Sequence, residues 1–170
     1  MTFFRFLDWL LDRLVGPFVA VLGLFIALAF AAGITLRSLG ISLFGMEELV
    51  LFAVVWFYML GAVLASKDRA HLQADFIPVM VKSEALALTI RIVATVISML
   101  MAGLFMLWSH ELLQWAFSRR QSTPVFSLPI YIAQASLFIA AVFMTLYLVR
   151  DLVSDIKALC RRRQDKNTRV

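Results

Sequence analysis

Charged residues and cysteine are both scarce in this 170-residue chain. Only 16% of its residues are charged, 62% are hydrophobic, and the single cysteine is Cys160. One cysteine excludes a disulfide within the chain and a cysteine-based metal cluster. A chain this short cannot hide so many apolar side chains in one core, because small domains leave a large share of their surface exposed. The composition therefore excludes an ordinary water-soluble domain and indicates a protein surrounded by lipid.

Four long stretches of the chain lack charge. They cover residues 14–36, 49–66, 92–109 and 125–149, and the third extends back to 85 if Arg91 is tolerated. A bilayer core of about 30 Å needs about 20 helical residues. The stretches are continuous, whereas the strands of a membrane barrel alternate over about ten residues. The sequence predicts an all-α integral membrane protein, a single membrane domain with transmembrane helices near 14–36, 48–66, 85–109 and 125–149.

Residues 2–13, which precede the first span, are amphipathic. Apolar side chains recur there at three- and four-residue steps, and the charged side chains gather on the opposite side. The apolar set is Phe3, Phe6, Leu7, Leu10, Leu11 and Leu14, and the charged set is Arg5, Asp8, Asp12 and Arg13. This pattern predicts an N-terminal amphipathic interfacial helix that lies flat on the membrane. A cleaved export signal is the alternative, but the first uncharged run is too long for a signal core.

Lysine and arginine are distributed unevenly among the segments outside the spans. The N-terminal segment, the loop between the second and third spans and the tail at 150–170 hold 13 of them, against 3 in the two other loops. Positive residues concentrate on the cytoplasmic side of membrane proteins. We therefore expect cytoplasmic N- and C-termini and external loops near 37–47 and 110–124. The asymmetry and the attraction of anionic lipid account for the net charge of +5, so nucleic acid is not an expected partner.

The second span is bounded tightly by charge on both sides. Two carboxylates open it, where the positive end of the helix dipole favours them, and basic residues follow its far end. An ordered set of residue types runs through and beyond this span: an acidic residue, a tryptophan midway, a Gly-Ala pair, a small residue, a basic residue, histidine and aspartate. These positions are Glu47 or Glu48, Trp56, Gly61, Ala62, Ala65, Lys67 or Arg69, His71 and Asp75, with Pro78 closing the loop. This set, with the four spans and basic ends, resembles the small membrane subunit (DctQ-like) of tripartite ATP-independent periplasmic (TRAP) transporters.

The resemblance implies a division of labour in the inner membrane of a bacterium. A periplasmic substrate-binding protein (DctP-like) captures an organic acid, and a large membrane transport subunit (DctM-like) moves it with a sodium gradient. The small subunit braces the large one. The resemblance implies no cofactor, no metal and no catalytic residue, so the chain is not expected to be an enzyme.

The residues themselves agree with a bracing role. Ion coupling inside a bilayer requires ionisable groups at depth, and Arg91 is the only candidate in any span. Eighteen residues separate Arg91 from His110, which is about 27 Å of helix and nearly crosses the membrane core. We therefore expect Arg91 at the cytoplasmic edge, with its head reaching lipid phosphate or Glu84. A buried pair with a partner subunit is the alternative.

Small residues and external charges suggest where partners bind. Gly23, Ala27 and Ala31 recur at four-residue steps in the first span, as do Gly61 and Ala65 in the second, and such stripes let helices approach closely. We predict that they pack against the large subunit. Trp56 lies at mid-depth and needs a partner for its indole N–H, so we expect it to face protein. The external arginines, which are Arg37, Arg119 and Arg120, are candidates for docking the binding protein.

Two other classes of membrane protein are alternatives to a TRAP transporter subunit. The first is a haem- or quinone-binding membrane anchor of a respiratory enzyme, for which two axial histidines must face each other at similar depth. His71 follows the cytoplasmic end of one span and His110 ends another outside, so only haem binding through one histidine stays open. The second is a standalone cation exporter, which requires an embedded carboxylate that none of the spans has.

Overall fold

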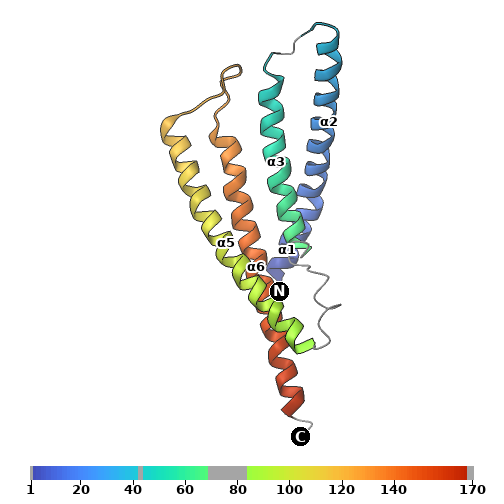
Figure 1. Cartoon of the computed structure of the whole chain (residues 1–170), viewed down its shortest axis with the longest axis vertical. Helices are drawn as coiled ribbons and strands as arrows, with labels where there is room; N and C mark the ends of the chain where they lie inside the picture. The colour runs from blue at the N-terminus through green and yellow to red at the C-terminus, as the bar shows by residue number, and fades with distance from the viewer. Residues whose placement is uncertain (1, 42–43, 69–83, 168–170) are drawn as a thin grey trace.

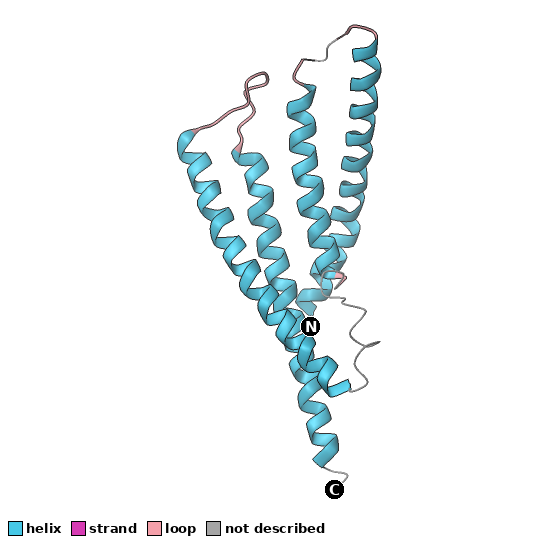
Figure 2. Cartoon of the chain, viewed as in Figure 1, coloured by secondary structure: helices cyan, strands magenta, loops and turns pink. Residues whose placement is uncertain are grey.

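The protein is a set of long helices (Figures 1 and 2). The computed structural model describes residues 2–41, 44–68 and 84–167. The helices are α1 (Thr2–Leu10), a short π-helix (Leu11–Val15), α2 (Gly16–Ser38), α3 (Met46–Lys67), α5 (Glu84–Arg119) and α6 (Tyr131–Asn167). Four helical stretches are long and apolar enough to cross a membrane, and they are Phe4–Ser38, Met46–Lys67, Thr89–Arg119 and Tyr131–Cys160. The predicted all-α class with four transmembrane helices is confirmed.

The long helices lie side by side in one row (Figure 1). α5 packs along α6, α6 along α3 and α3 along α2, so α2 and α5 form the two edges. Only 6% of the most apolar window is buried in each edge helix, against 28% in α3 and in α6. The row is one helix thick and therefore exposes apolar side chains on both of its faces.

The two ends of the row differ in what they carry (Figure 1). One end, called the terminal end here, carries α1, the end of α3, the start of α5 and the second half of α6. The opposite end, called the loop end, carries the connections at 39–45 and 120–130.

The amphipathic N-terminal segment is helical and packs against the row. α1 runs into α2 through the π-helix without a break, because the residues at both junctions keep right-handed helical dihedrals. Leu7 and Leu11 are buried in a cluster with Val63 of α3 and with Ala140 and Tyr147 of α6. One apolar side of the segment therefore stabilises the terminal end of the row. Its flat placement on a membrane stays a prediction.

The ends of the helices in the second half differ from the ends of the uncharged runs. α5 continues past Ser109 to Arg119 and stops where Arg120 adopts a positive φ of 47°. α6 begins at Tyr131, later than the start near residue 125 that the run indicated. Pro129 explains the later start. It pairs with Ser122 in an isolated bridge and therefore belongs to the loop, and its carbonyl oxygen accepts a hydrogen bond from the first turn of the helix.

The tail predicted at 150–170 is helical over its described part. α6 runs to Asn167 without interruption, although charge ended the predicted span at Val149. Lysine, arginine, glutamate and aspartate do not stop a helix, so charge marks the edge of the membrane and not the end of the helix. The extension places Asp151 and Asp155 on a buried side of α6.

Small side chains line the contact between α5 and α6. Thr95 and Ala116 of α5 and Ser136 of α6 are fully buried, and Ser109 is nearly so. The hydroxyls bond to carbonyls of their own helix, as Thr95 Oγ1 does to Arg91 O at 2.9 Å and Ser136 Oγ to Ala133 O at 2.7 Å. A hydroxyl satisfied in this way can be buried between helices at little cost. Small residues thus allow close packing of α5 on α6, whereas the sequence predicted such packing only for the first and second spans.

Candidate functional site

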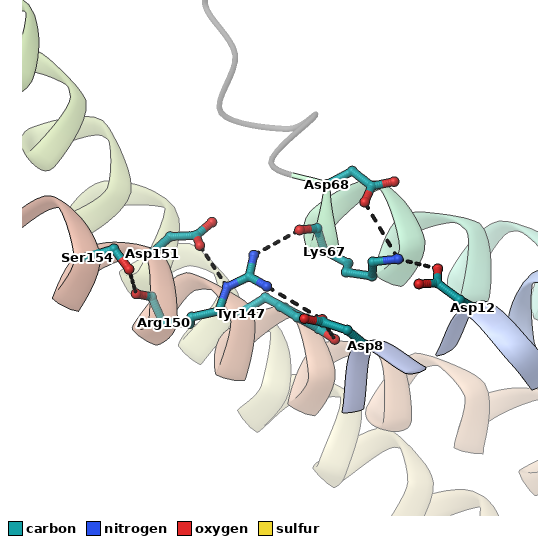
Figure 3. A network of polar contacts seen from close by, with 8 residues as sticks. All are labelled: Asp8, Asp12, Lys67, Asp68, Tyr147, Arg150, Asp151 and Ser154. Atoms are coloured by element: carbon teal, nitrogen blue, oxygen red, sulfur yellow. Dashed lines mark hydrogen bonds and ion pairs between the residues drawn. The ribbon is translucent and has the colours of Figure 1, made fainter. Parts of the chain in front are cut away.

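The terminal end contains a connected group of charged and polar side chains (Figure 3). We call it the terminal network, and its members come from the N-terminal segment, the end of α3 and α6. They are Asp8, Asp12, Lys67, Asp68, Tyr147, Arg150, Asp151 and Ser154. The carboxylates of the N-terminal segment therefore face the other helices.

Arg150 of α6 is the centre of the terminal network (Figure 3). Its Nε donates to Asp151 Oδ1 at 3.0 Å, and its Nη2 donates to the carbonyl oxygen of Lys67 at 2.8 Å. Its Nη1 lies 3.6 Å from Asp8 Oδ1, and the guanidinium carbon lies 4.6 Å from the centre of the Tyr147 ring. One planar side chain thus connects α1, α3 and α6, which suits the fixed donor fork of arginine.

Two further contacts attach the N-terminal segment to the row. The Tyr147 hydroxyl donates to Asp8 Oδ1 at 2.9 Å, and the Tyr147 side chain is fully buried. Lys67 pairs with Asp12, and its Nζ also lies 3.7 Å from Asp68 Oδ1. The sequence analysis missed this arrangement. The signal that could have found it is that Asp8 and Asp12, one turn apart, were predicted on the same side of the membrane as Lys67 and Arg150.

Arg91 of α5 pairs with Asp155 of α6. Its Nη2 donates to Asp155 Oδ1 at 2.6 Å and its Nε donates to Asp155 Oδ2 at 3.1 Å, a bidentate geometry. The Asp155 side chain is 5% exposed and the Arg91 side chain 46%. Asp155 is a partner within the chain that was not predicted for Arg91, and contact of Arg91 with lipid phosphate or Glu84 stays a prediction. The physical reason for the pair is the helical extension of α6, which brings a buried carboxylate opposite Arg91.

These contacts join helices to one another and lie outside the uncharged middle of the spans. Residues 14–36, 49–66, 92–109 and 131–149 contain no ionisable Asp, Glu, Lys or Arg, so these groups lie towards the two ends of the row. The pairs hold fixed geometries between helices. Breaking a buried pair by removing one partner costs about 3–5 kcal/mol, because a charge is left uncompensated. The terminal network therefore fixes how α1, α3 and α6 sit together.

The loop end has a polar contact of its own. Glu47 and Glu48 lie in the first turn of α3, as predicted. The Glu48 carboxylate accepts hydrogen bonds from the backbone N–H of Val125 at 2.8 Å and of Phe126 at 3.0 Å, whereas Glu47 is exposed. Glu48 thus connects α3 to the loop between α5 and α6. The favourable position of Glu48 at the positive end of a helix dipole did not predict this contact.

The small residues of the first span are divided between two environments. A Cβ added at Gly23 would lie 3.0 Å from the Phe57 ring of α3, so Gly23 allows α2 and α3 to approach inside this chain. Ala27 and Ala31 are exposed instead. The structure does not bring the predicted stripe together on one contact, and packing of Ala27 and Ala31 on the large subunit stays a prediction.

The motif residues of the second span lie along α3 and beyond it. Trp56, Ala62 and Ala65 are half-buried, and a Cβ added at Gly61 would meet no neighbouring atom within 4 Å. Lys67 belongs to the terminal network. The remaining motif positions, which are Arg69, His71 and Asp75, lie outside the described residues.

The other predicted residues lie at the loop end. Arg37 is in the last turn of α2, Arg119 ends α5, and Arg120 follows it, all three with exposed side chains. His110 of α5 lies with its ring 5.5 Å from the Phe138 ring and its Nε2 3.5 Å from Gln114 Nε2. Among the described residues, no three His, Cys, Asp or Glu side chains gather as metal ligands would.

Comparison with known proteins identifies the family. The model of the DctQ component of tripartite ATP-independent periplasmic transporters matches residues 26–158, and no curated protein sequence matches the chain. The matched segment contains most of α2, all of α3 and α5 and much of α6. With four helices that are apolar and long enough to span a bilayer, the chain is a multi-pass membrane protein and a transporter subunit. Since the match covers well over half of its length, the protein belongs to the DctQ family, the DctQ component of TRAP transporters.

Proposed function

We propose that this protein braces the large membrane transport subunit of a TRAP transporter during sodium-driven uptake of an organic acid. The observation that carries the proposal is the row of helices, in which most residues of the apolar windows are exposed. A row of this shape can place one face against a partner and the other against lipid. The excess of lysine and arginine at the terminal end supports placing that end in the cytoplasm of a bacterium, with the loop end facing the periplasm.

The absence of ionisable groups from the middle of the spans supports a bracing role. Binding of sodium or of an organic anion at mid-membrane uses broken helices or embedded polar groups. The described spans are continuous helices, and the charged pairs are confined to their ends. We infer that the large subunit supplies the path for substrate and sodium, and that this subunit supplies rigidity.

The exposed alanines of α2 are the proposed contact with the large subunit. Lipid tails are as apolar as leucine, so helices associate in a bilayer through close packing and not through a hydrophobic driving force. Ala27 and Ala31 would allow another backbone to approach α2 on the side that α3 does not cover.

Affinity purification of the tagged subunit with its large partner tests this contact. Ala27→Leu should reduce the amount of large subunit recovered, because the larger side chain separates the two helices. Val21→Leu is the matched control, since Val21 is exposed on α2 about a third of a turn away from Ala27. Equal recovery with both variants would show that the alanines face lipid.

We further propose that the loop end helps to dock the periplasmic binding protein. The exposed side chains of Arg37, Arg119 and Arg120 would attract an acidic surface, and charges at the rim of an interface act mainly on the rate of encounter. Reversing Arg119 and Arg120 to glutamate should lower uptake at a fixed concentration of binding protein and make it more sensitive to salt. Normal uptake by the double variant would exclude this loop from docking.

A further inference from the structure

One side chain joins the 120–130 connection to the start of α3. Glu48 lies in the first turn of α3, directly after the connection at 39–45, and its carboxylate accepts two backbone hydrogen bonds from the connection at 120–130. Each oxygen takes one N–H, from Val125 and from Phe126, so both acceptors are used on neighbouring amides. A carboxylate that accepts two amides in this way holds a loop more firmly than a neutral acceptor does.

A glycine allows the same two connections to touch. Gly45 caps α3 in the left-handed region, with a φ of 88°. A Cβ at this position would lie 2.6 Å from the Phe126 ring and 2.8 Å from Val125 Cγ1, which are clashes. The tip of the 120–130 connection is therefore seated on the residue that begins α3. Hydrogen bonds and packing agree that the tip of the 120–130 connection is held against the start of α3.

The 120–130 connection adopts a conformation that its own residues do not favour. Arg120 and Ser127 have positive φ values of 47° and 51°. Side chains other than glycine pay about 1–2 kcal/mol for this region. Backbone bonds inside the connection, from Thr123 N to Leu128 O at 2.9 Å and from Ile130 N to Gln121 O at 3.0 Å, hold its base. Its tip is held by Glu48.

We infer that Glu48 is a positioning residue that assembles the two connections into a single docking surface. This inference rests on the proposed docking of the periplasmic binding protein at the loop end. The surface combines exposed apolar side chains from both connections with the external arginines. The apolar members are Leu39, Ile41, Phe44, Val125 and Phe126, of which Phe44 is 84% exposed, and the arginines are Arg37, Arg119 and Arg120.

The occupant that fits this surface is a soluble protein with an apolar patch inside an acidic rim. The apolar side chains are carried by connections beyond the ends of the helices. Arginines lie at the ends of α2 and α5 and outnumber the exposed carboxylate of Glu47 at the start of α3. A loop that is already held in place loses less conformational freedom on binding, so its partner binds more tightly. Glu48 would thus act on the affinity for the binding protein without contacting it.

The two neighbouring glutamates offer a matched pair of variants. Glu48→Gln keeps the shape but presents an amide N–H where one loop N–H needs an acceptor, whereas Glu47→Gln removes the same charge from the same helical turn at an exposed position. Hydrogen–deuterium exchange of the peptide 121–130 would be measured in the assembled transporter in nanodiscs. Exchange of the Val125 and Phe126 amides should accelerate at least about tenfold in Glu48→Gln and stay unchanged in Glu47→Gln.

Uptake at varied concentrations of binding protein supplies the functional measurement. Glu48→Gln should raise the concentration that gives half-maximal uptake several-fold, while maximal uptake and the amount of assembled transporter stay the same. Unchanged exchange would overturn the positioning role itself. A smaller amount of assembled transporter would also overturn it, because Glu48 would then act on folding.

A third outcome distinguishes the positioning role of Glu48 from the proposed docking of the binding protein at the loop end. Faster exchange with an unchanged half-maximal concentration would show that releasing the connection does not weaken docking of the binding protein. The Arg119 and Arg120 reversal distinguishes the two failures. If the reversal lowers uptake while Glu48→Gln does not change the half-maximal concentration, docking at the loop end stands and the positioning role of Glu48 falls.

Discussion

Replacement of Arg150 by methionine is the most informative perturbation of the terminal network. The Arg150 side chain is 21% exposed and donates to Asp151 and to the Lys67 carbonyl. Methionine has a similar length and fills much of the same space, so loss of packing contributes little. The substitution removes the group that connects α1, α3 and α6 (Figure 3).

The magnitude follows from the burial of the partners. The Asp151 side chain is 1% exposed, so removing the guanidinium takes a charged partner away from a buried carboxylate, at a cost of up to about 3–5 kcal/mol. The Asp8 side chain is 33% exposed, and its weaker pair at 3.6 Å adds at most about 1 kcal/mol. For a chain of this size, a loss of about 4 kcal/mol corresponds to a melting temperature lower by about 10 °C.

The double variant Arg150→Met with Asp151→Asn separates charge from packing. Neutralising Asp151 removes the buried charge, so we expect the double variant to be more stable than Arg150→Met alone. The assay is thermal unfolding of the purified subunit in detergent. Arg13→Met is the control, since Arg13 is exposed near the same end and forms none of the ion pairs found among the described residues. Melting temperatures of Arg150→Met and Arg13→Met that agree within a degree would refute the reasoning.

Two further predictions concern the second pair and the topology. Arg91→Met should lower the melting temperature by several degrees, and Arg91→Met with Asp155→Leu should recover most of it, because a hydrophobic pair replaces a charged one without an unpaired charge; additive losses in thermal unfolding would contradict this. Cysteines introduced at Ile41 and Ser122 should react with a membrane-impermeant reagent in spheroplasts, and Cys160, which is exposed on α6, should not; labelling of Cys160 would reverse the proposed orientation.

The sequence predicted the spans well because the physics that sets them is local. An uncharged run of the right length must cross the membrane as a helix, and the positions of α2 and α3 follow from that rule. The start of α6 did not follow from it, because lack of charge does not distinguish a helix from the loop before Pro129. The described helical tail was missed for the opposite reason, since charge was taken as the end of the helix.

The pairs between helices could not be predicted from local patterns. Asp8 and Tyr147 are 139 positions apart, and Glu48 and Val125 are 77 apart. Each charged residue could be explained locally, either by the topology of the membrane protein or by a favourable interaction with a helix dipole. No partner elsewhere in the chain was therefore sought. Grouping the charges by the predicted side of the membrane would have brought Asp8, Asp12, Lys67 and Arg150 into one set.

The small residues show how a stripe can be divided by packing. Gly23, Ala27 and Ala31 recur at four-residue steps, yet Gly23 lies against Phe57 while the two alanines are exposed. A step of four residues advances by about 400°, so a stripe drifts around the helix by about 40° at each step. The drift carries the later members away from α3 and leaves them exposed.

Uptake by reconstituted subunits distinguishes a bracing subunit from one that transports substrate itself. Proteoliposomes would contain this subunit alone, the large subunit alone or both, with the binding protein loaded with its organic acid outside and a sodium gradient directed inward. We expect uptake only when both subunits are present, because this chain has no ionisable group in the middle of its spans and is proposed to brace the large subunit. Sodium-dependent uptake by this subunit alone, or full uptake by the large subunit without it, would contradict the bracing role.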